Sequence, residues 1–309
     1  MFILSRNLIY LIYAAIDIGS NAVRLLIQEA VFDGNEKTFY FKKIGLTRVP
    51  IRLGNDVFTS GEISKENTLN MINAFKAFKF LMKINKVDFF RACATSAMRE
   101  STNGENIVQK VLENTGVKID LISGKEEADL IFSNFHFAEL NKSTNYIYID
   151  VGGGSTELTI IKDNNRIAAK SFKIGSVRML KNNVDDNVWP NIYSWIEQQN
   201  ISNENFTAIG TGGSINKLYN LSSKKFKEPI HIDELLAVVK YIAAFSFDDR
   251  IIKLALKPDR ADVIVPSGEI YAKVMKAFKA TQMIVPKVGL ADGMIYNLFL
   301  DNEINSKKI

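Results

Sequence analysis

The segment Ala14-Ala15-Ile16-Asp17-Ile18-Gly19-Ser20-Asn21 returns in pattern as Ile147-Tyr148-Ile149-Asp150-Val151-Gly152-Gly153-Gly154-Ser155-Thr156. Each copy reads as an apolar strand, an aspartate, a glycine-rich turn and a second apolar strand. A third candidate strand follows each copy, at residues 38–44 and at residues 166–174. A pattern that repeats in this order predicts a duplicated fold of the α/β class.

The length of 309 residues, with 47% hydrophobic residues, suits two domains rather than one. Apolar periodicity predicts helices at residues 64–85 and 105–115, and a mainly helical stretch from about residue 233 onward. A strand passes into a helix near Ser123-Gly124, which places the predicted boundary there. We therefore expect an N-terminal domain at residues 1–124 and a C-terminal domain at residues 125–309, whose last helix could pack back on the first domain.

The composition excludes several classes of protein. A single cysteine, Cys93, permits no internal disulfide, and the two histidines, His136 and His231, cannot complete a cysteine/histidine zinc site. This usage favours the cytoplasm. The formal charge of +5 comes with lysines spread over predicted helix faces, so we expect no nucleic-acid partner. Residues 8–16 are better read as a buried strand than as a short signal sequence, and no run approaches the roughly 20 apolar residues of a membrane span.

Both glycine turns suit phosphate. Glycine lets backbone N–H groups crowd together and point inward, and neighbouring serine, threonine or asparagine side chains add donors. The candidate phosphate-binding residues are Gly19, Ser20, Asn21, Gly152, Gly153, Gly154, Ser155 and Thr156. A carboxylate beside phosphate needs a divalent cation between the two, so Asp17 and Asp150 are candidate magnesium or water-positioning ligands. A plain tight hairpin is the alternative for either turn alone, and neither turn is a Walker-type P-loop.

Two further features could contact an anion. Arg99 follows a strand and a run of small residues, where a guanidinium could hold phosphate with two donors; a surface salt bridge with Glu100 or a neighbour is the alternative. The third glycine turn, at residues 210–214, does not match a Rossmann fingerprint, but a glycine turn at a helix start can bind anions. Gly212, Gly213 and Ser214 are therefore candidate contacts to a phosphate or a ribose.

Two acidic residues are candidates for the chemistry. Ser123 and Glu126 have the spacing of a capping box, which leaves Glu127 without a structural role. Glu127 could complement the helix dipole, or act as a general base that orients water toward phosphorus. Glu157 is expected opposite Asp150 across the second hairpin, either as a solvated strand end or, with Asp150, as a metal or water ligand.

At several ordered blocks the chain resembles the exopolyphosphatase and guanosine pentaphosphate phosphohydrolase family of the actin, sugar-kinase and Hsp70 superfamily. The blocks are residues 15–21, 94–99, 122–128, 150–157, 175–178, 260–266 and 289–293, so the resemblance covers nearly the whole chain. It implies two ribonuclease-H-like (actin-like ATPase) domains with mixed sheets flanked by helices, an active site in the cleft between them, and a need for Mg²⁺ or another divalent cation.

The resemblance also assigns roles to residues. It implies that Glu127 is the general base, that Asp150 and Glu157 are the essential acidic pair, and that Arg99 grips phosphate. Arg52 falls in a short block, residues 52–54, that the family shares, and is a candidate substrate contact. With Asp17, the acidic pair makes up the candidate metal ligands.

We expect a magnesium-dependent phosphohydrolase that removes the terminal orthophosphate of inorganic polyphosphate. Hydrolysis of guanosine pentaphosphate is the close alternative, and nothing in the sequence separates the two substrates. Ser214 and Ala291 depart from the residues that the family more often has, and the helical C-terminal domain of longer members is missing, which favours short chains or small substrates. A sugar kinase and a non-catalytic nucleotide- or alarmone-binding protein are more distant alternatives. Because related folds often form dimers, a homodimer is also considered.

Overall fold

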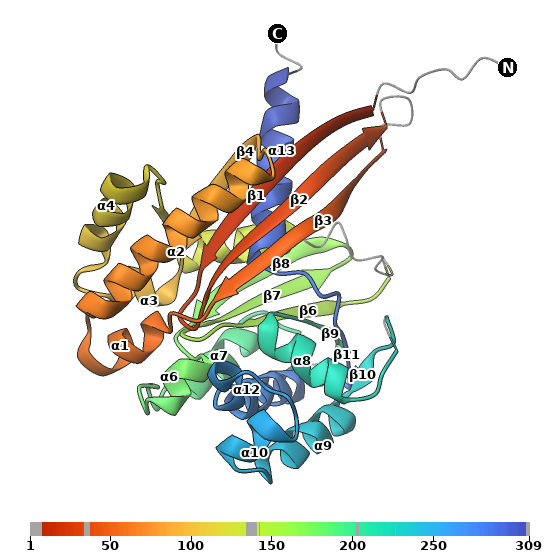
Figure 1. Ribbon diagram of the computed structural model, residues 1–309. Helices are drawn as coiled ribbons and strands as arrows, with labels where there is room; N and C mark the ends of the chain where they lie inside the picture. The colour runs from red at the N-terminus through yellow and green to blue at the C-terminus, as the bar shows by residue number, and fades with distance from the viewer. Residues whose placement is uncertain are drawn as a thin grey trace, which may run out of the picture.

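Two mixed β-sheets, one built by each half of the chain, form the framework of the computed structural model (Figure 1). The structure describes residues 8–33, 38–133, 141, 143–201, 204–225 and 227–306. The first sheet has the order β3-β2-β1-β4-β5. Its strands are β1 (Leu8–Ile18), β2 (Val23–Asp33), β3 (Thr38–Val49), β4 (Phe89–Ala94) and β5 (Asp120–Leu121). The first three strands run antiparallel, whereas β4 is parallel to β1 and β5 is parallel to β4.

The second sheet repeats this arrangement in the order β10-β11-β9-β6-β7-β8. Its strands are β6 (Tyr146–Val151), β7 (Thr156–Lys162), β8 (Asn165–Phe172), β9 (Thr207–Thr211), β10 (Ile230–His231) and β11 (Gln282–Ile284). Strands β6, β7 and β8 form an antiparallel meander, and β9 lies parallel to β6 as β4 lies parallel to β1. The predicted duplication and the predicted class of two mixed sheets flanked by helices are therefore confirmed.

From Tyr13 to Ile18, both faces of β1 are buried, which explains the apolar sequence of this part of the strand. Ala14 and Ile16 face the cluster that contains Phe75 and Phe78 of α2. Tyr13 and Ala15 face the opposite cluster, together with the C-terminal helix. The interpretation of residues 8–16 as a strand is thus confirmed, because alternate side chains fill two different cores.

The helices of the first half pack on one face of its sheet. They are α1 (Leu53–Ser60), α2 (Lys65–Ile84), α3 (Ser96–Glu100) and α4 (Gly104–Thr115). Helix α2 begins where the Ser64 hydroxyl accepts a hydrogen bond from the Asn67 N–H at 3.2 Å. The helices predicted at residues 64–85 and 105–115 are therefore confirmed.

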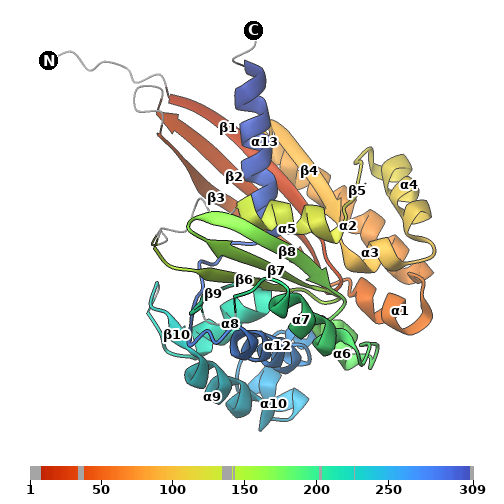
Figure 2. The same cartoon turned by 180° about the vertical axis from the view of Figure 1, so that it is seen from behind.

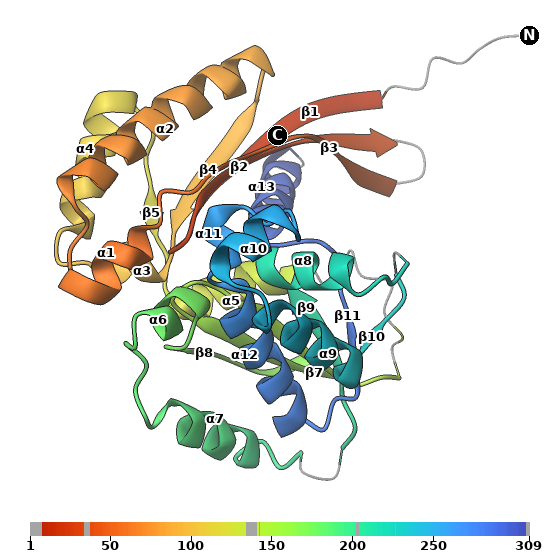
Figure 3. The ribbon, with the colours of Figure 1, turned by 60° about the horizontal axis from the view of Figure 1, so that its bottom comes forward.

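The helices of the second half gather around the second sheet, as the view from below shows (Figure 3). They are α6 (Ser176–Leu180), α7 (Val188–Glu197), α8 (Gly213–Leu221), α9 (Ile232–Ala243), α10 (Phe247–Ile252), α11 (Pro258–Ala261) and α12 (Ile264–Ala277). Helix α12 packs against α8, α9 and β6 and carries much of this core.

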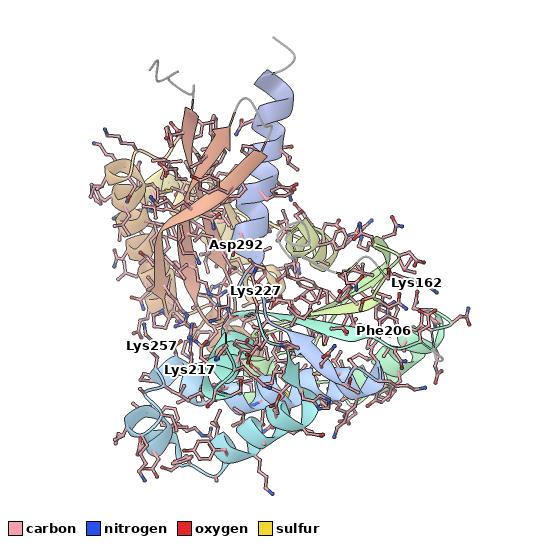
Figure 4. The ribbon with its side chains drawn as sticks, turned by 90° about the vertical axis from the view of Figure 1, so that its right-hand side faces the viewer. Lys162, Phe206, Lys217, Lys227, Lys257 and Asp292 are labelled. Carbon is pink, nitrogen blue, oxygen red and sulfur yellow. The ribbon has the colours of Figure 1, made fainter. Side chains whose placement is uncertain are left out.

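Two helices occupy the seam between the sheets (Figure 2). Helix α5 (Gly124–Phe132) contacts β7 and β8, and α13 (Leu290–Ser306) contacts α5, β1, β2 and β4. Figure 4 labels Asp292, which lies in the first turn of α13 where the two sheets meet. The chain thus returns to the first sheet at its end, and the boundary between residues 124 and 125 stays a prediction.

Within the described residues, the structure contains no helix that is both long enough and apolar enough to span a membrane. Cys93 is buried in β4, and burial raises the pKa of its thiol to about 12. His136 lies outside the described residues.

Candidate active site

A cavity lies between the two halves, where both glycine turns meet. The predicted site residues that line it are Asp17, Gly19, Ser20, Asn21, Glu127, Asp150, Gly152, Gly153, Ser155, Gly212, Gly213 and Ser214. The predicted residues absent from this lining are Arg52, Arg99, Gly154, Thr156 and Glu157. The two hairpins, which lie more than 100 residues apart in the sequence, therefore meet at this cavity.

The turns approach each other so closely that glycine is required at their contact. A Cβ atom on Gly153 would lie 2.9 Å from the Ser20 Cβ. A Cβ atom on Gly154 would meet the Ser20 and Ser96 hydroxyls and the Phe58 ring. The Ser20 and Ser96 hydroxyls are 2.9 Å apart, so the first turn and α3 are linked at the same point.

The carbonyls of both turns are bound by the helix that follows the third strand of each meander. In the first turn, the Ser20 and Asn21 carbonyls accept from the Gly54 and Arg52 N–H groups at 2.7 and 3.2 Å. In the second turn, the Gly152 and Gly153 carbonyls accept from α6. Because C=O and N–H point in opposite directions across a trans peptide, the N–H groups of the turns are directed to the other side.

The second turn has unused backbone donors. Within the part of the chain that the structure describes, no group accepts a hydrogen bond from the N–H of Gly153, Gly154 or Ser155. Consecutive free N–H groups form a concavity that favours an anion. The geometry supports the phosphate-binding interpretation of this turn over a plain hairpin.

In the first hairpin, an arginine neutralises the charge of the aspartate. Asp17 is directly opposite Arg24 across β1 and β2, and Arg24 donates to the Asp17 carboxylate at 2.9 Å. The Asp17 residue is only 4% exposed.

The second hairpin places two carboxylates opposite each other instead. Asp150 faces Glu157 across β6 and β7, and Glu157 accepts a hydrogen bond from Ser171 at 2.8 Å. Burial raises the pKa of Asp150 to about 6, against the opposing effect of the Arg24 guanidinium. Burial, and then the Asp150 carboxylate, raise the pKa of Glu157 to about 7. Such a pair is stabilised by a cation.

Glu127 lies in the first turn of α5 with its side chain facing the cavity. It is 7% exposed, and its Oε2 atom has no hydrogen-bond partner. Burial first, and the Glu157 carboxylate second, raise the pKa of Glu127 well above its ordinary value, against the effect of Arg99. A buried carboxylate oxygen without a donor is costly, which indicates that the position is kept for a ligand or a water.

The predicted capping box is only half formed. The Ser123 hydroxyl accepts from the Glu126 N–H at 3.1 Å, as expected. The Glu126 carboxylate pairs with Arg91 at 2.9 Å instead of returning to the cap, because Arg91 offers a charged donor on the neighbouring strand.

Arg99 contacts Glu127 but does not line the cavity. Its Nη1 atom donates to the Ile122 carbonyl at 2.5 Å and lies 3.7 Å from the Glu127 carboxylate. Of the alternative salt bridges, the one with Glu100 is wrong, because Glu100 pairs with Arg178 at 2.7 Å and with Lys173 at 3.5 Å; the ion pair that Arg99 does form is with Glu127.

The side chains of three other predicted contact residues bind to groups of the protein itself. Arg52 pairs with Asp262 at 2.5 Å. The Thr156 hydroxyl donates to the Ile174 carbonyl at 2.6 Å, and the Ser214 and Ser267 hydroxyls are 2.9 Å apart. In this structure, therefore, the side chains of these residues are not directed at an anion.

Three arginines that line the cavity were not predicted from the sequence: Arg24, Arg48 and Arg260. Arg24 and Arg260 converge near Gly213, whose Cβ would lie 3.4 Å from Arg24 and 3.6 Å from Arg260, whereas Arg48 pairs with Asp259. Burial lowers the pKa of Arg260, and Arg48 and Arg24 lower it further, so an anion here would relieve repulsion. The signal for Arg24 was present, because its place opposite Asp17 follows from the hairpin register.

Among the described residues, no group of three or more histidine, cysteine, aspartate or glutamate side chains could hold a metal ion alone. The Asp150 and Glu157 carboxylates nevertheless fit Mg²⁺ in chemistry, since this ion takes oxygen ligands and is usually held by one or two carboxylates plus substrate phosphates.

Comparison with known proteins gives a consistent result. The model of the Ppx/GppA phosphatase family matches residues 31–302. A bifunctional 3-dehydroquinate synthase/phosphatase of Fusobacterium nucleatum is 29% identical over 297 residues, which cover 88% of this chain but 44% of that protein. The chain therefore spans less than half the length of this relative.

Other relatives match along most of the chain. Exopolyphosphatase 1 of Mycobacterium leprae is 23% identical, with 93% of this chain and 89% of the relative covered. A guanosine-5'-triphosphate,3'-diphosphate pyrophosphatase of Photobacterium profundum is 24% identical, with 96% and 61% covered. The crystal structure of an exopolyphosphatase from Cytophaga hutchinsonii superposes with a TM-score of 0.78 at 20% identity, covering 93% of this chain and 97% of that one. This last likeness concerns the fold.

Proposed function

The chain belongs to the Ppx/GppA phosphatase family, and from this premise we propose that it removes the terminal orthophosphate from inorganic polyphosphate. The observation that carries the proposal is the buried, unbonded Oε2 atom of Glu127, which faces a cavity lined by two anion-binding turns. A carboxylate placed in this way is suited to orient a water molecule toward a phosphorus atom.

In the proposed reaction, Glu127 takes a proton from water while the water oxygen bonds to the terminal phosphorus. The bond between that phosphorus and the bridging oxygen breaks, and the bridging oxygen leaves with the electron pair as the new chain end. The N–H groups of Gly153, Gly154 and Ser155 hold the terminal phosphate, and Arg99 keeps the Glu127 carboxylate in place.

Asp150 and Glu157 are the residues that we propose hold the divalent cation. When bound, magnesium neutralises charge on the phosphates. Asp17 is the weaker of the candidate ligands, because its carboxylate is already paired with Arg24. Arg24, Arg48 and Arg260 are placed to receive the next phosphates of the chain.

Guanosine pentaphosphate is a second candidate substrate. A hollow adjoins the cavity on the side of the three arginines, and its lining mixes apolar side chains, Leu26, Leu46 and Leu290, with the charged side chains of Lys43, Lys287 and Asp292. Apolar side chains can pack on a nucleobase, and cationic groups can bind further phosphates.

The proposal is tested by measuring orthophosphate release from short polyphosphate, long polyphosphate and guanosine pentaphosphate in parallel, with and without Mg²⁺. The wild type should release phosphate from at least one of them, and Glu127→Gln should lower the rate by roughly 10²- to 10⁴-fold, the usual contribution of a general base. Glu126→Gln is the matched control, since Glu126 pairs with Arg91 on the protein surface.

Release that is indifferent to Glu127→Gln would reject this base. Transfer of phosphate to an added alcohol in place of water would assign a kinase. Binding without release from any substrate would leave the non-catalytic interpretation.

A further inference from the structure

Arg178 is a buried arginine beside the active site that does not line the cavity. It belongs to α6, and it is 5% exposed. Its Nε donates to the Gly154 carbonyl at 2.8 Å, its Nη2 donates to Glu100 at 2.7 Å, and its Nη1 donates to the Asn183 side-chain oxygen at 3.0 Å. The guanidinium also lies 4.1 Å from the centre of the Phe58 ring. Any influence of Arg178 on substrate must therefore act through these neighbours.

The neighbours of Arg178 come from opposite halves of the molecule. Gly154 is in the turn of the second hairpin, whereas Phe58 lies in α1 and Glu100 ends α3 of the first half. Helix α3 begins at Ser96, which lines the cavity and contacts Ser20. One side chain thus connects the phosphate-binding turn of the second half to the helices that shape the cavity in the first half.

The carbonyl of Gly154 is bound in a different way from the two before it. The Gly152 carbonyl accepts from the Ser176 N–H at 3.0 Å, and the Gly153 carbonyl accepts from the Val177 N–H at 2.8 Å. Both donors belong to the backbone of the same half. The Gly154 carbonyl accepts from a side chain instead, so the direction of the Ser155 N–H depends on where the Arg178 guanidinium lies.

We propose that Arg178 is a positioning residue that couples the orientation of the Gly154–Ser155 peptide to the contact between the two halves. Asn183 holds the guanidinium from its own half, whereas Glu100 and Phe58 hold it from the other half. If the halves separate, water hydrates both charged groups, so the contact is reversible and differs from an apolar packing contact. This inference rests on the proposed function and adds a link between closure and phosphate binding.

The test is the affinity for magnesium imidodiphosphate, a non-hydrolysable probe, measured by calorimetry. Arg178→Gln should raise the Kd by roughly ten- to a hundredfold, as expected for the loss of a hydrogen bond from a charged group. Glu100→Gln keeps an acceptor for Arg178 but removes the charge, and should raise the Kd by roughly three- to tenfold. Arg166→Gln is the matched control, because Arg166 pairs with Asp129 away from the turn, and its Kd should stay within about twofold.

The double variant separates positioning from general destabilisation. If Glu100 acts through Arg178, the variant with both substitutions should bind no more weakly than Arg178→Gln alone. Additive losses, or Glu100→Gln with the wild-type Kd, would overturn the inference. If Arg178→Gln does not fold, the Kd of Glu100→Gln, compared with the Kd of the Arg166→Gln control, decides the test. Because this Kd needs no turnover, a wild type that releases no orthophosphate would refute the proposed function and leave this test intact.

Discussion

In the first hairpin Asp17 faces Arg24 across the strands, whereas at the equivalent place in the second hairpin Asp150 faces Glu157. The backbone hydrogen bonds of the two turns are alike, because the carbonyls of each turn accept from the helix that follows its meander. The duplication has thus kept the backbone geometry that presents N–H groups and has changed the charge beside it. The charge of the first aspartate is balanced without a ligand, whereas the second hairpin leaves two facing carboxylates, which we propose bind a cation.

The largest expected effect comes from removing the charges of the second hairpin. Asp150→Asn should lower the rate of orthophosphate release by about 10³-fold, on the scale of a lost electrostatic contribution in an active site. Asp17→Asn, the matched change in the first hairpin, should lower it by only about tenfold, because Arg24 already balances that charge. Steady-state kinetics over a range of Mg²⁺ concentrations measure both. Equal losses would contradict the division of roles between the hairpins.

The two turns also differ in how closely their glycines are packed. A Cβ on Gly154 would collide with Ser96, Phe58 and Ser20, whereas on Gly19 its nearest neighbour would be the Ala22 carbonyl oxygen at 3.4 Å. Gly154→Ala should therefore lower activity by about a hundredfold through displaced hairpins, as 1 Å shifts at an active site can. Gly19→Ala should keep activity within a few fold. A Gly19→Ala enzyme as impaired as Gly154→Ala would contradict this difference in packing between the two turns.

A further comparison concerns stability and not the reaction rate. Asp150 and Glu157 have pKa values of about 6 and 7, above their ordinary values of 3.8 and 4.5. The folded protein thus holds these protons more tightly than the unfolded chain. Without magnesium, the stability that they contribute is present below about pH 4 and is lost as the pH rises through 6 to 7.

The size of this term is at most about 3 kcal/mol for each group. Thermal unfolding of the magnesium-free protein between pH 4 and pH 8 should show it as a fall in Tm, relative to the variant that carries both Asp150→Asn and Glu157→Gln. Adding Mg²⁺ at pH 8 should raise the wild-type Tm by several degrees and leave that variant unchanged. A wild type with no pH-dependent difference from the variant would contradict the buried pair.

The residues that could be predicted from the sequence are those whose role follows from local pattern. The repeated hairpins, the Asp150–Glu157 pairing and the helix beginning at Ser64 all follow from period, turn chemistry and capping. Arg48 and Arg260 could not be found in this way, because the pairing of Arg48 with Asp259 and the approach of Arg260 to Arg24 depend on how the two halves pack. Glu100 shows the same limit: its neighbour in sequence, Arg99, is the obvious partner, yet the contact between the halves pairs it with Arg178.

The chain passes between the two sheets twice, once through α5 and once between β11 and α13, and α5 and α13 touch each other. Two bodies joined at two points rotate most easily about the line through those points, while sliding and twisting would stretch the connections. One angle should therefore describe most of the relative motion of the halves. The α1–α6 contact lies away from both passages in Figure 2 and would open widest. A fluorescent pair placed across α1 and α6 would report that angle directly.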